Sequence, residues 1–95
     1  TIPSTFAVHQ NYPNPFNPVT TIQYELPENS FVKVRIYDLK GRLVNTVVNQ
    51  EETAGYKAIK WAGVDDKGKA VSAGIYLYEI NAGSFRKVRK MVLLK

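Results

Sequence analysis

Apolar and polar residues alternate along several short stretches of this chain. Over residues 20–26 and again over residues 32–36, every second side chain is apolar and most of those between are polar. Alternation of this kind places the apolar side chains on one face of a β-strand. No window has helical periodicity, so the pattern predicts an all-β chain. Strand-like stretches continue at short spacing over residues 42–48, 56–61, 75–82 and 85–94.

Residues that favour turns separate these stretches. Residues 38–41 predict a tight hairpin turn in which Gly41 is free to adopt a positive φ. Residues 65–68 and 83–84 predict further turns, and residues 49–55 a polar loop. About seven short antiparallel strands divided by turns in a chain of 95 residues are typical of an immunoglobulin-like β-sandwich.

The alternation also predicts which side chains form the core. The residues expected to be mostly buried are Ile22, Tyr24, Val32, Val34, Ile36, Ile59, Trp61, Leu77 and Met91. Residues 91–94 are apolar on both faces, so this segment is expected to be covered on both sides or to lie in the middle of a sheet. Residues 86–90 are mostly polar and are expected to follow the surface.

A proline-rich segment precedes the first long strand. It holds three prolines within six positions, and each fixes φ and lacks an N–H donor, so the segment is expected to be a rigid, extended lead-in. Tyr12 and Phe16 are its predicted apolar anchors. Residues 1–10 are interpreted as a linker remnant with Phe6 and Val8 as docking residues, since a chain that begins with Thr1 is expected to be a fragment.

Composition narrows the function classes. The chain has 95 residues, which is the length of one domain. It has no cysteine, which excludes disulfides and thiolate metal sites, and its net charge is +5. Basic residues are spread over the whole chain, which favours solvated strands over a nucleic-acid surface. We therefore expect no nucleic-acid partner and no membrane insertion.

Candidate catalytic and metal-ligating groups are few. His9 is the only histidine, and no nucleophile or orienting acid accompanies it in the sequence, so we expect no enzymatic activity. Asp65 and Asp66 suggest a calcium loop, but they lack the alternating acidic ligands of an EF-hand, so a hairpin turn is favoured. No cofactor is expected, with a partial calcium site as the alternative.

Three aromatic residues allow two interpretations. Trp61, Tyr76 and Tyr78 could form a platform for sugar or single-stranded nucleic acid. They could equally fill the core of a sandwich, which is the more common use of such side chains.

Several sequence blocks resemble a known family. Residues 11–18 read Asn-Tyr-Pro-Asn-Pro-Phe-Asn-Pro, residues 74–76 read Gly-Ile-Tyr, and residues 90–95 read Lys-Met-Val-Leu-Leu-Lys. In this order they resemble the type A C-terminal sorting domain of type IX secretion, over residues 11–95. The flagellar hook-capping protein's immunoglobulin-like domain is similar around residues 61–78. The recognition residues that the sorting-domain resemblance implies are Pro13, Asn14, Pro15, Gly74, Tyr76, Lys90, Val92 and Lys95.

The resemblance implies a function in export. The domain would direct an upstream passenger through the type IX machinery to the cell surface. The resemblance also implies a sortase-like peptidase as a partner, and it leaves open whether the domain is removed or retained. An exposed edge of the last strand, with Lys90 and Lys95, would be read by strand addition. The alternative is a structural or carbohydrate-associated immunoglobulin-like module of a multidomain secreted hydrolase or adhesin.

Overall fold

The structure, a computed structural model, describes residues 2–94, and these form seven β-strands. The all-β prediction is confirmed, and no helix in this range is long and apolar enough to cross a membrane. In chain order the strands are β1 (Ala7–Val8), β2 (Thr20–Leu26), β3 (Ser30–Asp38), β4 (Leu43–Glu52), β5 (Gly55–Trp61), β6 (Gly74–Ala82) and β7 (Phe85–Leu93).

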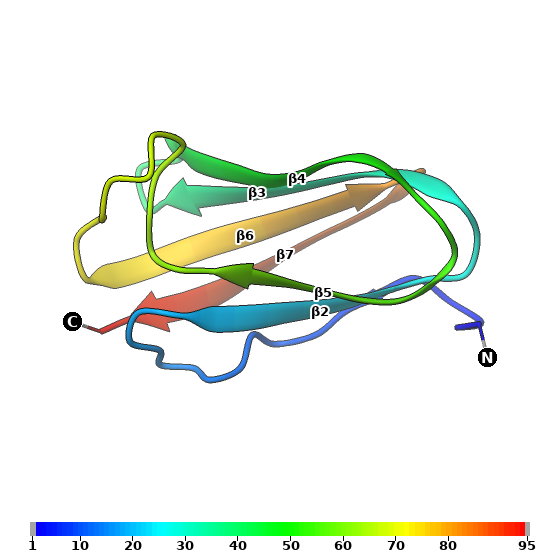
Figure 1. Cartoon of the computed structure of the whole chain (residues 1–95), viewed down its shortest axis with the longest axis horizontal. Coiled ribbons are helices and arrows are strands. Elements are labelled where there is room, and N and C mark those ends of the chain that lie inside the picture. Colours follow the sequence, from blue (N-terminus) through cyan, green and yellow to red (C-terminus); the bar gives the residue numbers. More distant parts are fainter. Residues whose placement is uncertain (1, 95) are drawn as a thin grey trace.

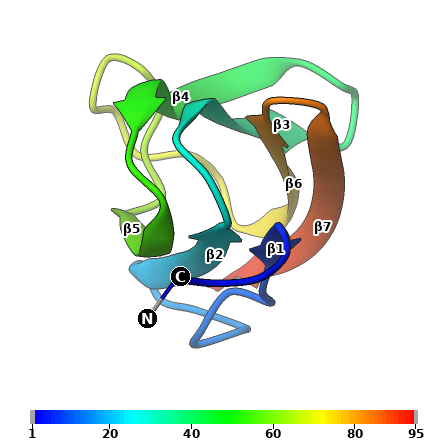
Figure 2. The same ribbon diagram turned by 90° about the vertical axis from the view of Figure 1, so that its right-hand side faces the viewer.

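The strands pair into two antiparallel sheets packed face to face. One sheet has the order β1-β2-β5 and the other β4-β3-β6-β7. Figure 1 shows the strands of both sheets running close to one direction, and Figure 2 shows the two layers from the end. The predicted immunoglobulin-like β-sandwich is therefore confirmed. The N-terminal and C-terminal ends lie at opposite ends of the long axis, which measures 37 Å (Figure 1).

The core lies between the sheets and follows the alternation of β2 and β3. Burying an apolar side chain of this size contributes about 1.5–3 kcal/mol, so these rows of side chains drive the packing. The largest side chains that are fully buried are Trp61, Tyr24, Tyr78, Phe16, Ile22, Leu26, Ile36, Ile80, Met91, Leu93, Val32 and Val34.

Two predicted core positions are only half-buried. Leu77 lies on the solvent side of β6 because the aromatic rings of Tyr76 and Tyr78 take the opposite, inner face. Both faces of this strand are apolar, so periodicity gave the wrong face for Leu77. Ile59 faces the core but packs at its margin, because β5 is an edge strand of the three-stranded sheet.

The predicted polar loop over residues 49–55 is mostly wrong. β4 continues through Glu52, and Asn49 pairs with Lys33. β4 is an edge strand, and its polar side chains there face water, so the strand carries no apolar signal. The predicted hairpin turn over residues 38–41 is confirmed: Gly41 has a φ of 83°, and its N–H donates to the Asp38 carbonyl at 3.0 Å.

Segments near both ends of the chain are part of the sandwich. Ala7 and Val8 form a short strand against β2, so this part of the expected linker over residues 1–10 is folded; Thr1 lies outside the described residues. The predicted docking residues are confirmed, since Val8 is buried and the Phe6 ring stacks on that of Phe85 at 5.3 Å.

Residues 91–94 were expected to lie mid-sheet or to be covered on both sides, and neither alternative holds, since β7 is an edge strand and its outer face is only partly covered. Met91 and Leu93 are buried, while Leu94 is 49% exposed. Lys90 and Arg86 are exposed, as predicted, so the strand passes from a solvated start to a buried finish.

Candidate functional site

The proline-rich segment lies against the outer edge of β7. The Phe16 N–H donates to the Val92 carbonyl at 3.0 Å, and the Leu94 N–H donates to the Phe16 carbonyl at 2.7 Å. The side-chain oxygen of Asn14 accepts from the Val92 N–H at 3.0 Å. We call residues 9–18 the clasp, because they occupy the backbone groups that the end of this edge strand would otherwise leave open.

The clasp is also tied to the interior of the molecule. Tyr12 exchanges both backbone hydrogen bonds with Thr21, at 3.0 and 2.9 Å. The buried hydroxyl of Tyr78 accepts from the Asn11 N–H at 2.9 Å and donates to the His9 carbonyl at 2.7 Å. One core tyrosine therefore satisfies two backbone groups where the segment turns along the edge of the sandwich.

The two predicted anchors of this segment behave differently. The Phe16 ring is 1% exposed and lies 5.9 Å from the Trp61 ring, between centroids. The Tyr12 side chain is 80% exposed, so its predicted role as an anchor is wrong. The backbone of Tyr12 does the anchoring, since both of its polar groups pair with Thr21.

The structure brings several of the predicted recognition residues together at the end of β7. Asn14, Val92 and Lys90 come together, since the Lys90 carbonyl accepts from the Gln10 side chain at 2.8 Å. Pro13 and Pro15 are exposed on the clasp, and Gly74 pairs with Leu93 beside it. Lys95 lies outside the described residues. The open edge expected for strand addition is thus occupied by the clasp along the end of β7.

The aromatic platform is part of the core. Trp61 is 2% exposed, and its ring meets that of Tyr76 edge-on at 5.5 Å. Its Nε1–H donates to the Val64 carbonyl at 2.8 Å, and the Tyr76 hydroxyl donates to the Ser72 carbonyl at 2.6 Å. Tyr78 is also fully buried. The core interpretation is confirmed, and none of these rings offers a face to a ligand.

The aspartate loop is a tight turn. The Asp65 carboxylate accepts from the N–H groups of Lys67 and Lys69 at 2.9 and 3.0 Å, and Gly68 has a φ of 81°. Hydrogen bonding from the Lys69 backbone lowers the pKa of this carboxyl below its usual value. Among residues 2–94, no group of three or more metal-ligating side chains is gathered.

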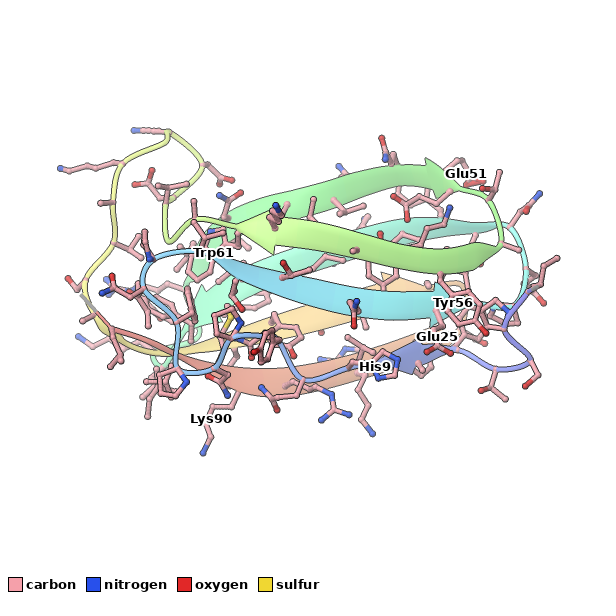
Figure 3. All side chains as sticks on the ribbon, turned by 60° about the horizontal axis from the view of Figure 1, so that its bottom comes forward. His9, Glu25, Glu51, Tyr56, Trp61 and Lys90 are labelled. Atoms are coloured by element: carbon pink, nitrogen blue, oxygen red, sulfur yellow. The ribbon has the colours of Figure 1, made fainter. Side chains whose placement is uncertain are left out.

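An exposed polar pair lies on the outer face of the three-stranded sheet. His9 Nε2 is 2.5 Å from Glu25 Oε2, and the Tyr56 ring, 63% exposed, lies across the ladder from Glu25 (Figure 3). With Gln23 and Lys57 these residues line a shallow cavity of about 110 Å³. In the sequence His9 has no partner nearby, because only the pairing of β1 with β2 brings Glu25 next to it.

A second, larger cavity lies on the outer face of the four-stranded sheet. Its volume is about 380 Å³ and it opens widely to solvent. Its lining combines cationic, amide and aromatic side chains with one glycine. This cavity was not found from the sequence, because its lining residues come from β3, from β6 and from the turn that follows β6. The lining residues are Phe31, Lys33, Arg35, Asn81 and Gly83.

Comparison with known proteins gives one family. The sequence model of the FlgD Ig-like domain matches residues 17–84, and none of the curated proteins matches. Among solved structures, FlgD from P. aeruginosa superposes with a TM-score of 0.61 at 26% identity, covering 80% of this chain and 64% of that protein.

Two structures from Porphyromonas gingivalis share the fold. Dimeric latent PorU superposes with a TM-score of 0.71 at 24% identity, and PorZ, described as an essential surface component of the type IX secretion system, with 0.61 at 22%. Each match covers 95% of this chain but only 9% of PorU and 11% of PorZ, so the chain spans about a tenth of their length.

The assignment to the type IX sorting domain is wrong. The family model that matches is that of the FlgD Ig-like domain, and FlgD itself is among the structural neighbours. The blocks at residues 11–16 and 90–95, which carried much of the resemblance, lie outside the matched range. In this structure residues 11–16 belong to the clasp, and residues 90–94 form the strand end that it covers.

Proposed function

The chain belongs to the FlgD Ig-like domain family, and from this premise we propose that it is a non-catalytic structural module of a larger secreted protein. The family match carries the proposal. The module would hold the neighbouring parts of its parent protein at a fixed separation. This proposal takes up the alternative stated from the sequence, in its structural version: an immunoglobulin-like module of a multidomain secreted hydrolase or adhesin.

The shape of the molecule supports a spacing role. The two chain ends lie at opposite ends of a 37 Å axis, so a segment joined at either end would be held apart by the length of the sandwich (Figure 1). The clasp strengthens this arrangement because it ties residues near the start of the chain to residues at its end, through Asn14 and Val92. The clasp bonds to Thr21 of β2 and to Val92 of β7, so it joins the two sheets near one end of the sandwich.

The placement of polar groups supports a non-catalytic role. The ring of His9 faces the Glu25 carboxylate on an open surface, and the buried hydroxyls of Tyr76 and Tyr78 donate to backbone carbonyls. The carboxylate of Asp65 is engaged by backbone N–H groups. These bonds hold the fold and engage the two tyrosine hydroxyls and the Asp65 carboxylate.

We propose that the parent protein acts outside the cytoplasm. The family is named for a flagellar hook-capping protein, and 80% of this chain is similar to FlgD from P. aeruginosa. The partner in this proposal is the passenger domain joined to the module in the same chain.

Replacement of the module within its parent protein tests the spacing role. An unrelated immunoglobulin-like domain of similar length should preserve the parent's function, whereas a flexible glycine-serine linker with the same number of residues should not. Loss of function with both replacements would contradict the spacing role, because it would show that a rigid domain of similar length is not sufficient for function. Full function with the linker would also contradict it.

A carbohydrate-associated role has one observation in its favour. The exposed Tyr56 ring, with His9, Gln23 and Glu25 beside it, offers an apolar face next to hydrogen-bonding groups. Affinity electrophoresis in gels that contain soluble polysaccharides tests it. A retardation that Tyr56→Ala removes and Tyr12→Ala preserves would support this role, and an absence of retardation would exclude it for the polysaccharides used.

A further inference from the structure

One end of the outer face of the four-stranded sheet is apolar. In an antiparallel sheet with one buried face, the other normally alternates to polar residues. Here Tyr37 lies between Leu43 and Leu77 in the cross-strand register, and Ile75 pairs with Val92. Leu43 and Ile75 remain 48% and 37% exposed. An apolar surface of this kind commonly marks an interaction site.

A cationic cavity adjoins this apolar surface. Lys33 and Arg35 on β3 and Asn81 on β6 line it, and Phe31, 45% exposed, forms its rim. Lys33 and Asn81 face each other directly across the ladder, so the ammonium and amide groups approach the same space. The volume of about 380 Å³ accommodates a side chain with a terminal carboxylate.

The charges on this face are not balanced. Glu79, which pairs with Arg35 across the ladder, is largely buried and accepts from Arg86 Nε at 2.5 Å. Among residues 2–94, that is the one salt bridge that Glu79 forms. One carboxylate therefore lies between two guanidinium groups, and Lys33 adds a further positive charge beside them.

Arg35 has an unsatisfied donor. Within the described part of the chain, its Nε is the one buried side-chain nitrogen or oxygen without a hydrogen-bond partner. Buried donors are nearly always paired in folded proteins. Arg35 also lines the cavity. Arginine binds a carboxylate through two parallel hydrogen bonds, for which Nε–H and an Nη–H can be the donors.

We propose that this cavity binds the carboxylate of an acidic polypeptide segment, whose apolar residues cover the adjoining face around Tyr37 and Leu77. Arg35 would hold the carboxylate, Lys33 would add charge, and the Asn81 amide would donate to its second oxygen. The proposal goes beyond the spacing role and does not depend on it. It names a surface through which the module binds another protein segment.

The apolar part of the surface favours a polypeptide over an acidic polysaccharide. A uronic acid could supply the carboxylate, but its hydroxyl groups would be poorly placed against Leu43, Leu77 and Ile75. A peptide strand that carries acidic and apolar side chains matches both parts of the face. Charge complementarity and apolar contact together select this occupant.

A titration monitored by nuclear magnetic resonance tests the proposal. The probe is a short, end-capped peptide of glutamate and leucine residues, added to the isotope-labelled 95-residue chain. The variants are Arg35→Gln and Lys33→Gln. The matched control is Lys60→Gln, which removes an equal charge from an exposed position on the other sheet. A peptide with glutamine in place of glutamate controls for apolar binding.

The expected result is a set of shifted backbone amides confined to β3, β6 and the turn at Gly83. Arg35→Gln should weaken binding about tenfold and Lys60→Gln by no more than about twofold, with circular dichroism unchanged. Raising the salt from about 0.1 M to about 0.5 M should weaken binding to the unmodified chain.

Three results would overturn the proposal. Shifts spread over both sheets, or equal weakening by Arg35→Gln and Lys60→Gln, would show non-specific charge attraction. Binding of polygalacturonate at this cavity without binding of the peptide would assign the surface to a polysaccharide. Absence of any shift with the glutamate peptide would exclude the site.

Discussion

Replacement of Phe16 by alanine tests whether the clasp is part of the folded core. The ring is 1% exposed and packs against Trp61, so its loss removes a large buried side chain and leaves a cavity. Substitutions of buried Phe by Ala cost about 3–5 kcal/mol. A chain of 95 residues has a total stability of about 5–14 kcal/mol, so the change should remove a large part of it.

The substitution separates packing from backbone hydrogen bonding. The bonds of residue 16 to Val92 and Leu94 are made by its backbone and remain available to alanine. The loss therefore reports the ring alone. Urea denaturation followed by circular dichroism and by fluorescence of Trp61, the single tryptophan, measures it. The melting temperature should fall by about 12 °C or more.

Tyr12→Ala is the matched control for this experiment. Tyr12 is an aromatic residue of the same segment, but its side chain is 80% exposed. Its replacement should change the free energy of unfolding by no more than about 0.5 kcal/mol. A loss below about 1 kcal/mol for Phe16→Ala, or equal losses for both variants, would refute the account of the clasp as core.

Four further outcomes follow from buried contacts and titrating groups. Trp61→Ala should cost about 3–5 kcal/mol in urea denaturation, because the ring is buried; a cost below about 1 kcal/mol would indicate an exposed ring. Tyr78→Phe should cost about 1–3 kcal/mol, since it leaves two backbone groups of the clasp unpaired; an unchanged denaturation midpoint would contradict this. Burial, with the nearby Glu52 carboxylate, raises the pKa of Tyr24, so the unfolded chain ionises first and stability should fall as the pH rises above 10.0; Tyr24→Phe should flatten that decline in alkaline melting curves. The pKa of Asp65 is lowered in the folded state, so its contribution is present above pH 3.8 and is lost as the pH falls below it; acid titrations of Asp65→Asn should show a smaller loss.

The sequence predicted correctly those strands that carry apolar side chains on one face only. In β2 and β3 the apolar side chains occupy alternate positions only, so the pattern defines both the strand and its buried face. Gly41 could also be assigned, because a positive φ in a short turn strongly favours glycine.

The errors lie where this local signal is absent. Leu77 lies on a strand with two apolar faces, so the choice of the inner face depends on which side chains fill the sandwich. Asn49 belongs to an edge strand whose polar residues face water and therefore resemble a loop. The contact of Asn14 with Val92 joins positions far apart in sequence, and no periodicity reports it.

The mistaken family assignment has a related cause. The blocks around Gly74 and Tyr76 reflect the requirements of an immunoglobulin-like sandwich, namely a strand start and a core aromatic residue. Any family built on this fold can satisfy them. The cationic cavity was missed for a different reason: Lys33 and Asn81 are neighbours only through the register of β3 and β6.

Hydrogen exchange at the end of β7 tests the central claim most directly, namely that the clasp covers this end of the edge strand and is part of the folded module. The amides of Val92 and Leu94 donate to the clasp. Val88 lies four residues before Val92, so its amide points to the same edge of β7, and within residues 2–94 no hydrogen bond joins it to the clasp. The account predicts that Val92 and Leu94 exchange only through large-scale unfolding, far more slowly than Val88. Exchange of Val92 and Leu94 as fast as that of Val88 would show an open edge and contradict the account.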